Sequence, residues 1–229
     1  MTPSEYFHLV QTTFREHGRP EVAQGQMAYM RHQFEYFGLK GPIWLALTKE
    51  IHSGAGCPTG DDLKTLVRHC FADDHRELHY FALETVQKTL KKQPAEFLDF
   101  LEELIVTRSW WDTVDWLAKL VGIHLLRFPT LRPSATARWL ASSNIWLQRV
   151  SMIFQLTYRD QTNADLLFHN IRQLMDSPEF FLQKGAGWAL RQYSKTDPAA
   201  VRAFVTNNPV APLTRREALK WLHKNAAQT

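Results

Sequence analysis

The sequence has little cysteine, no long apolar run and no large excess of one charge. Only Cys57 and Cys70 are cysteines among its 229 residues, too few for a disulfide framework and typical of a reducing cytoplasm. No run of about 18 apolar residues could span a membrane, and the N-terminus lacks the basic and then apolar pattern of a signal peptide. We therefore expect a cytoplasmic chain without a membrane segment.

Several motifs that mark common enzyme classes are missing as well. The sequence contains no phosphate-binding glycine loop and no Gly-x-Ser-x-Gly nucleophile elbow. His75 and His79 have metal-ligand spacing on a helix, but no further ligand completes a site of the His-Glu-x-x-His kind. Cys57 with His69 and Cys70 makes no better site. We therefore expect no metal site at these residues.

The charge balance permits nucleic-acid binding without establishing it. The 27 basic and 23 acidic residues give a net charge of +4, and a binding surface depends on how such charges cluster.

The pattern predicts helices nearly throughout. No hairpin turn flanked by alternating apolar residues occurs, and about a dozen helical segments are separated by short breaks. The widest break, Ser53–Gly60, is interpreted as a loop between helix pairs rather than a domain linker, so residues 1–229 form one domain. Four prolines stand where helices are expected to begin, the position where proline is tolerated: Pro20, Pro94, Pro198 and Pro212.

The chain also repeats itself. Leu78, Asp112, Leu147 and Leu182 follow one another at spacings of 34, 35 and 35 residues, each near the start of a predicted helix. Two helices in about 35 residues are typical of an α-solenoid. Because the tetratricopeptide pattern is absent, we predict an all-α solenoid of HEAT-like repeats, whose concave face is lined by one helix from each pair.

The segment from Ser109 to Asp115 carries the clearest chemical signal. In a helix, Trp111 and Asp115 lie four residues apart and share one face. A buried carboxylate is costly without a partner, whereas an indole can hold a cation and a carboxylate can stabilise developing positive charge. The pair indicates chemistry on a cationic group.

The repeat brings further residues toward Asp115. Arg149 and Lys184 align with Val114, one residue before Asp115, so Asp115 and Arg149 are expected on adjacent helices about 8–10 Å apart, facing one groove. Trp188 follows Lys184 by four residues, on the same face.

Each of these assignments has an alternative that the residues leave open. Trp111 shares its column with Trp146 and Phe181, which is the pattern of a core stripe, and Asp115 could be a solvated or capping acid. Arg149 is either an ordinary surface arginine or part of a basic stripe with Lys184. That stripe could extend through residues that could equally form a solvated face: Arg191, Lys195, Arg215, Arg216 and Lys220. The tract 185–187, Gly-Ala-Gly, is expected inside a helix that packs closely.

Long motifs over nearly the whole chain resemble one family. They are residues 100–115 (FLEELIVTRSWWDTVD), 144–149 (NIWLQR), 180–188 (FFLQKGAGW), 211–218 (APLTRREA) with Asn208, and 28–30 (AYM). These segments are similar to the AlkD family of bacterial DNA alkylation-repair glycosylases.

The resemblance implies a HEAT-like solenoid that holds duplex DNA and excises N3- and N7-alkylated purines, such as 3-methyladenine and 7-methylguanine, as a monomer without base flipping, metal or cofactor. It implies that Asp115 is the catalytic carboxylate and that Trp111 and Trp188 face the DNA. The expected DNA-binding residues are Arg149, Tyr29, Lys184 and Arg191. Lys40, where the family suggests an uncharged polar residue, and the loop between Gly54 and Gly60 depart from the expected pattern.

Two other functions compete with this hypothesis. A non-catalytic HEAT-repeat protein that recognises bent or branched DNA would bind duplexes without releasing bases, but would gain nothing from an acid that faces phosphates. A protein-interaction solenoid would bind partners without DNA affinity, and the basic column of Arg149 and Lys184 argues against it.

Overall fold

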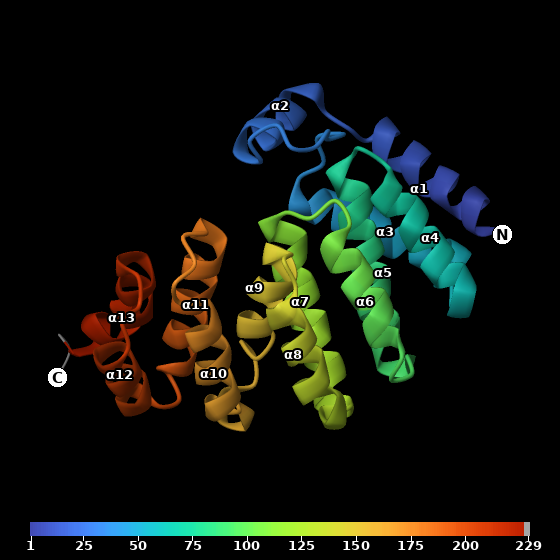
Figure 1. Ribbon diagram of the computed structural model, residues 1–229. Helices are drawn as coiled ribbons and strands as arrows, with labels where there is room; N and C mark the ends of the chain where they lie inside the picture. The colour runs from blue at the N-terminus through green and yellow to red at the C-terminus, as the bar shows by residue number, and fades with distance from the viewer. Residues whose placement is uncertain (227–229) are drawn as a thin grey trace. The chain divides into compact units, whose positions relative to one another are not determined.

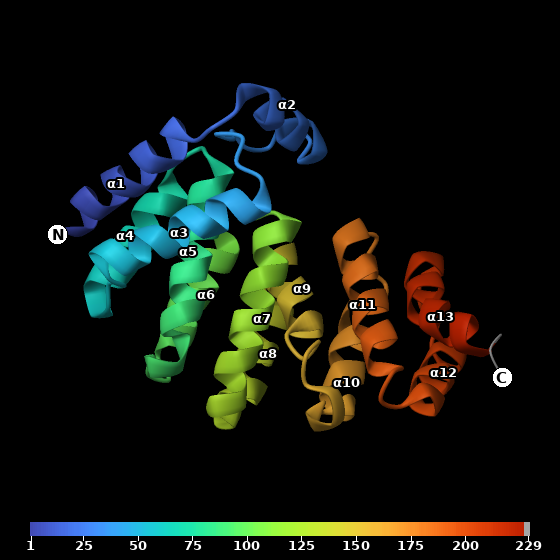
Figure 2. The same cartoon turned by 180° about the vertical axis from the view of Figure 1, so that it is seen from behind.

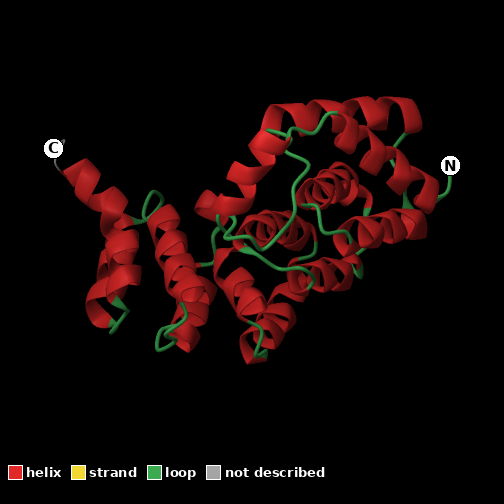
Figure 3. Cartoon of the chain, turned by 90° about the horizontal axis from the view of Figure 1, so that it is seen from above, coloured by secondary structure: helices red, strands yellow, loops and turns green. Residues whose placement is uncertain are grey.

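The computed structural model describes residues 1–226, and these form helices joined by loops, of which the segment 30–40 is the longest (Figure 3). They contain thirteen α-helices, three short 3-10 helices and no strand, which confirms the expected all-α class. The one isolated backbone bridge within this range joins Glu35 to His75. Contacts divide the chain into two compact units, with the boundary between Pro94 and Ala95.

The N-terminal unit packs four long helices around an apolar core. Its first helix begins with a capping box, in which Thr2 and Glu5 each accept a hydrogen bond from the other's backbone N–H. Phe14 and Phe81, both fully buried, meet edge to face at 6.2 Å between ring centroids. The helices are α1 (Pro3–Glu16), α2 (Pro20–Tyr29), α3 (Gly41–Ala55), α4 (Gly60–Ala72) and α5 (Arg76–Thr89), followed by the 3-10 helix η1 (Leu90–Lys92).

The C-terminal unit stacks helix pairs, as HEAT-like repeats do. The elements are α6 (Phe97–Val106), α7 (Trp111–Arg127), η2 (Pro129–Leu131), α8 (Arg132–Ala141), α9 (Ile145–Ile153), η3 (Arg159–Gln161), α10 (Ala164–Leu174), α11 (Phe180–Tyr193), α12 (Pro198–Asn207) and α13 (Pro212–Ala226). Within this unit, α7, α9, α11 and α13 each pack against the next and form one row (Figures 1 and 2). This row holds the candidate catalytic and DNA-binding residues of the C-terminal unit, which are Trp111, Asp115, Arg149, Lys184, Trp188 and Arg191.

Two expectations about helix ends need correction. Pro20, Pro198 and Pro212 do begin helices, but Pro94 lies three residues before α6. The predicted break at Ser53–Gly60 is shorter, because α3 continues to Ala55 and α4 already begins at Gly60. The helix α3 ends where Gly56 takes a φ of 78°, a conformation that favours glycine.

The glycines of the tract 185–187 do lie inside a helix, and they permit close packing as expected. A Cβ atom on Gly187 of α11 would lie 2.6 Å from Cβ of Glu217 and 3.0 Å from the carbonyl oxygen of Thr214. Both of those residues belong to α13, so the backbones of α11 and α13 approach too closely for any side chain at this position.

Among residues 1–226, no helix combines the length and the apolar character needed to cross a membrane.

We predict that Gly187→Ala destabilises the protein, because the added methyl group overlaps α13 and forces the two helices apart. The expected loss is about 1–3 kcal/mol of unfolding free energy, measured by urea denaturation. Gly25→Ala is the matched control, since Gly25 also lies in a helix but a Cβ there meets nothing within 4 Å. The control should be neutral or stabilising by up to about 1 kcal/mol. Equal effects of the two substitutions would contradict this account of α11–α13 packing.

Candidate functional site

Three helices of the row place charged residues at the same position from their start. Because α7, α9 and α11 begin at Trp111, Ile145 and Phe180, Asp115, Arg149 and Lys184 are each the fifth residue of their helix. The sequence alignment, which put Asp115 one residue beyond the other two, is off by one at α7. The cause is the spacing of the helix starts, because α7 and α9 begin 34 residues apart whereas α9 and α11 begin 35 residues apart.

Asp115 and Arg149 form a bidentate ion pair between α7 and α9. Arg149 donates from Nε to Oδ1 of Asp115 at 2.8 Å and from Nη2 to Oδ2 at 3.0 Å. The guanidinium plane matches the two carboxylate oxygens, a geometry that makes such pairs strong and directional. The Arg149 side chain is 4% exposed and the Asp115 side chain 20%. The pair therefore presents its negative end to solvent.

The remaining guanidinium nitrogen of Arg149 is also engaged. Nη1 donates to the carbonyl oxygen of Phe181 on α11 at 2.5 Å, so the side chain joins α7, α9 and α11. A Cβ on Gly185 of α11 would lie only 3.0 Å from Nη1. The first glycine of the tract 185–187 thus leaves space for the arginine head group. Arg149 is consequently surrounded by protein acceptors rather than extended into solvent.

Burial dominates the electrostatics of Asp115. Loss of hydration raises the pKa of Asp115 above its ordinary value, and the hydrogen bonds and charge of Arg149 oppose this shift without cancelling it. The nearby charge of Asp112 raises the pKa of Asp115 further. The carboxylate is therefore a stronger base than an exposed aspartate.

An aromatic cluster packs beside this ion pair, but it is built on Trp110 rather than on Trp111. Trp110 lies 6.0 Å from Trp146 and 5.4 Å from Phe181, and the last two rings lie 4.9 Å apart, between centroids. In the corrected alignment the second residues of the three helices are Asp112, Trp146 and Phe181, so Trp111 leaves the aromatic column. Trp110 reaches the cluster from the N-cap position before α7. Trp111 is half-buried, one helical turn before Asp115.

Lys184 and Arg191 of α11 share one carboxylate partner. Nζ of Lys184 donates to Oε1 of Glu217 at 2.7 Å, and Nη1 of Arg191 donates to Oε2. Glu217 lies on α13 and its side chain is 8% exposed. Hydrogen bonds and charge from Lys184 and then Arg191 lower the pKa of Glu217. Trp188, half-buried, lies on α11 between the two cations in sequence.

Sequence reasoning missed Glu217. It is 33 residues from Lys184, and nothing in its surroundings (Arg215-Arg216-Glu217) distinguishes it from a solvated acid. The close approach at Gly187 brings it against α11, and the Gly-Ala-Gly tract was the only signal of that approach.

The remaining predicted residues lie in the N-terminal unit. Tyr29, the last residue of α2, is 72% exposed, and Lys40 is exposed at the start of α3. The histidines considered as metal ligands have other partners. His75 contacts Asp73 at 2.8 Å and stacks on Phe37, while His79 pairs through Nδ1 with Arg76 and through Nε2 with the carbonyl of Asp73.

The fold and the charged residues on α7, α9, α11 and α13 define a HEAT-like helical-repeat protein. Its half-buried carboxylate, Asp115, lies on this row of helices. Residues 10–222 match the model of the family described as DNA alkylation repair enzyme, and the chain belongs to that family.

Solved structures support the same assignment. A predicted DNA alkylation repair enzyme from Enterococcus faecalis is 31% identical, with a TM-score of 0.85 over 90% of this chain and 97% of that one. Two structures from Streptococcus mutans share the fold at 19% identity and a TM-score of 0.59. AlkD2 is matched over 79% of this chain and 89% of its own, and smu.31 of strain UA159 over 78% and 96%. No curated protein sequence is matched.

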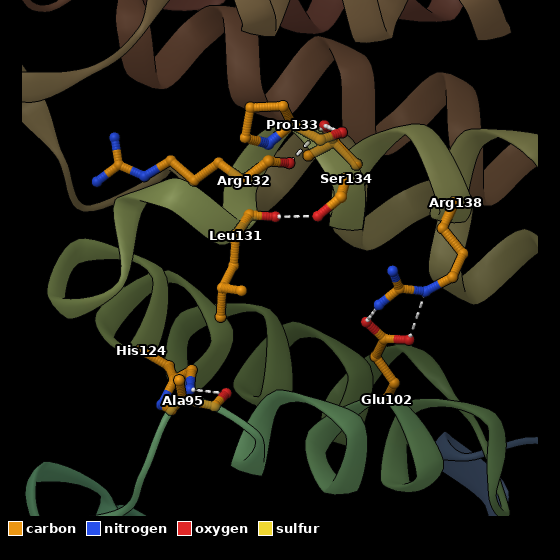
Figure 4. Close-up of polar contacts among 9 residues, drawn as sticks. Ala95, Glu102, His124, Leu131, Arg132, Pro133, Ser134 and Arg138 are labelled. Carbon is orange, nitrogen blue, oxygen red and sulfur yellow. Dashed lines mark hydrogen bonds and ion pairs between the residues drawn. The ribbon is translucent and has the colours of Figure 1, made fainter.

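We predict that Asp115→Asn lowers the free energy of unfolding by about 1–3 kcal/mol, because it leaves the buried Arg149 without an anionic partner. The control is the ion pair between Arg138 of α8 and Glu102 of α6 (Figure 4), whose arginine is 52% exposed. Solvent screening should limit the cost of Glu102→Gln to less than about 1 kcal/mol. Urea denaturation of the three proteins provides the comparison, and equal costs would show that burial of Arg149 does not set the effect.

The pH dependence of stability should report on Glu217. Because the folded pKa of Glu217 is below its ordinary 4.5, its contribution is present above the unfolded pKa and is lost as pH falls through the lowered folded value. We predict that Glu217→Gln has a lower Tm than the parent protein at neutral pH. The difference in Tm should become smaller as the pH is lowered, which thermal scans from pH 7 to 3 would measure. Glu50→Gln, which removes an exposed acid of α3, should leave the profile nearly unchanged. A difference in Tm between Glu217→Gln and the parent that does not change with pH would contradict an ionic contribution of Glu217 to stability.

Proposed function

We propose that this protein is a monofunctional DNA glycosylase that removes positively charged N3- and N7-alkylated purines, such as 3-methyladenine and 7-methylguanine, from duplex DNA. Its family membership supports DNA alkylation repair as the process. The observation that carries the proposal is the carboxylate of Asp115, which Arg149 holds in a fixed orientation at the edge of the helix row.

The chemistry of the lesion suits a site of this kind. Alkylation at N3 or N7 makes the purine cationic, so it leaves as a neutral base without prior protonation. As the glycosidic bond breaks, its electron pair goes to the base and positive charge grows on the deoxyribose, as in the oxocarbenium-like state of sugar hydrolysis. A fixed carboxylate near C1′ stabilises that charge.

Asp115 can also complete the hydrolysis. A water molecule adds through its oxygen to C1′, and the proton that it then loses passes to the carboxylate and on to solvent. The raised pKa of Asp115 favours this role, since a general base works best when its pKa approaches the working pH. The products are the free alkylpurine and an abasic site. No step requires a metal or a cofactor.

In this proposal Arg149 positions Asp115 and does not bind a phosphate. All three of its guanidinium nitrogens donate to protein oxygens, and the side chain is almost completely buried. Lys184 and Arg191, which share the single charge of Glu217, keep one net positive charge for DNA. Trp111 and Trp188 flank the nucleotide and place the cationic base by cation–π attraction. Recognition through charge and sugar requires no flipping of the base.

A non-catalytic DNA-binding protein is the second candidate. It is favoured by one observation, that Asp115 is satisfied by Arg149 and could serve only to join α7 to α9. The two functions differ in whether a base is released.

The test uses duplex DNA that carries 7-methylguanine, with single-turnover release of the free base as the measurement. We predict release by the parent protein, unaffected by EDTA, and a loss of about 10²–10³-fold in Asp115→Asn, the size seen when one preorganised electrostatic group is removed. Asp112→Asn removes a neighbouring carboxylate from the first turn of α7 and should retain activity within a few-fold. Circular dichroism at the assay temperature establishes that both variants are folded.

Other outcomes of this assay have definite meanings. DNA binding without base release by the parent protein would establish the non-catalytic function. If Asp115→Asn released 7-methylguanine as fast as the parent protein, the glycosylase activity would stand but the proposed role of Asp115 would be wrong. Efficient release of uracil, a neutral base, would contradict selection by the charge of the lesion.

A further inference from the structure

The turn that follows α2 has an unusual backbone for its residues. Arg31 and His32 are consecutive non-glycine residues with positive φ, 55° and 56°. The N–H of Arg31 donates to the carbonyl of Ala28 at 3.1 Å, and that of His32 to the carbonyl of Met27 at 2.8 Å. These are the two hydrogen bonds of a Schellman motif, in which Arg31 stands at the left-handed position that glycine normally takes.

The conformation costs free energy that glycine would avoid. A left-handed L-residue brings its Cβ close to the following carbonyl oxygen. Such residues persist only where the surrounding structure over-determines the backbone, and they gather at functional sites. Arg31 and His32 are therefore held in this turn by other parts of the N-terminal unit.

The following residues show what holds the turn. Phe34 is buried beneath the guanidinium of Arg76, 3.7 Å from the ring centroid. Glu35 donates from its backbone to Asp74 and accepts from the backbone of Arg76. The segment is thus fastened to the start of α5 directly after the strained residues.

A buried carboxylate fixes the end of the same segment. Glu77, fully buried, accepts hydrogen bonds from the backbone N–H groups of Phe37, Gly38 and Leu39 at 2.9–3.1 Å. With Arg76 and Glu77 as anchors, residues 33–39 are rigid although they form no helix or strand. The turn before them is consequently presented in one conformation.

The surface of this turn is cationic and aromatic. Arg31, His32 and Gln33 are exposed. Tyr29, two residues before Arg31, is 72% exposed, the largest fraction among the exposed aromatic side chains. A glycine at position 31 would preserve the backbone without strain, so the fold itself gains nothing from the arginine side chain. What the arginine side chain contributes at this position is a positive charge on the protein surface.

We propose that the turn Arg31–His32, beside Tyr29, is a preformed contact for the phosphate backbone of duplex DNA, with Arg31 as its principal contact. The inference rests on the proposed function only in taking duplex DNA as the partner. Phosphate contacts by cations supply most of the sequence-independent affinity for DNA. A rigid turn loses little conformational entropy on binding, which increases the affinity gained from each contact.

The test compares Arg31→Gly with Arg159→Gly. Arg159 is also exposed and left-handed, with φ of 54°, but begins η3 in the C-terminal unit. Both substitutions relieve backbone strain and should raise Tm. Only Arg31→Gly should weaken binding to an undamaged duplex, by about 3–10-fold at low salt, and reduce the slope of log K against log salt by about 1. Arg31→Asn, which tolerates the same backbone, separates loss of charge from added flexibility and should weaken binding equally.

Each outcome of this test either supports or overturns the proposed contact of Arg31 with DNA. Higher Tm in both glycine variants with weaker DNA binding in the Arg31 variants alone supports the inference. Unchanged affinity in Arg31→Gly and Arg31→Asn, equal losses in Arg159→Gly, or no duplex binding by the parent protein overturns it. Base release from 7-methylguanine DNA, measured at saturating protein on the same samples, tests the proposed function separately. That activity can survive loss of the Arg31 contact.

Discussion

The ion pair between Asp115 and Arg149 is the interaction on which the candidate site depends. Burying a guanidinium is costly unless its donors are satisfied, and here three donors find the two oxygens of Asp115 and the carbonyl of Phe181. Those acceptors belong to different helices. The requirement to satisfy one arginine therefore fixes the relative positions of α7, α9 and α11, because a one-residue slip of any of them would rotate its acceptor by about 100°.

A second polar contact continues this row to α13. Glu217 accepts from Lys184 and Arg191 across the interface at which Gly187 brings the backbones together. Each neighbouring pair of helices in the row is thus joined by a charged contact as well as by apolar packing. Three cations face two carboxylates in these contacts, so the contacts together carry one net positive charge, consistent with a polyanionic partner.

The sequence predicted the class of fold well and the details of the site less well. The absence of hairpin signals and the 35-residue repeat were sufficient for an all-α HEAT-like protein, since both are local properties. The alignment failed by one residue at α7, because α7 and α9 begin 34 residues apart whereas the alignment used a spacing of 35. That single error placed Trp111 in the column of Trp146 and Phe181, where Asp112 belongs. The contact of Trp110 with those rings comes from the loop before α7, outside the repeat. Glu217 could not be predicted, since its pairing arises only when α11 and α13 approach at Gly187.

An aspartate paired with an arginine can still act on a cation. If both charges were equally exposed, their fields would nearly cancel at a distance. In this structure the Arg149 side chain is almost completely buried, and the carboxylate is the more exposed of the two groups. The pair therefore acts as an oriented dipole whose negative end faces outward, and a cation that approaches Asp115 lies much closer to it than to Arg149. Arginine keeps its charge at any pH at which the protein is folded, so the orientation of the dipole is permanent. The same burial that raises the pKa of Asp115 also removes competing water. A cationic deoxyribose would therefore meet a carboxylate that needs no reorganisation, which is the property that electrostatic catalysis requires.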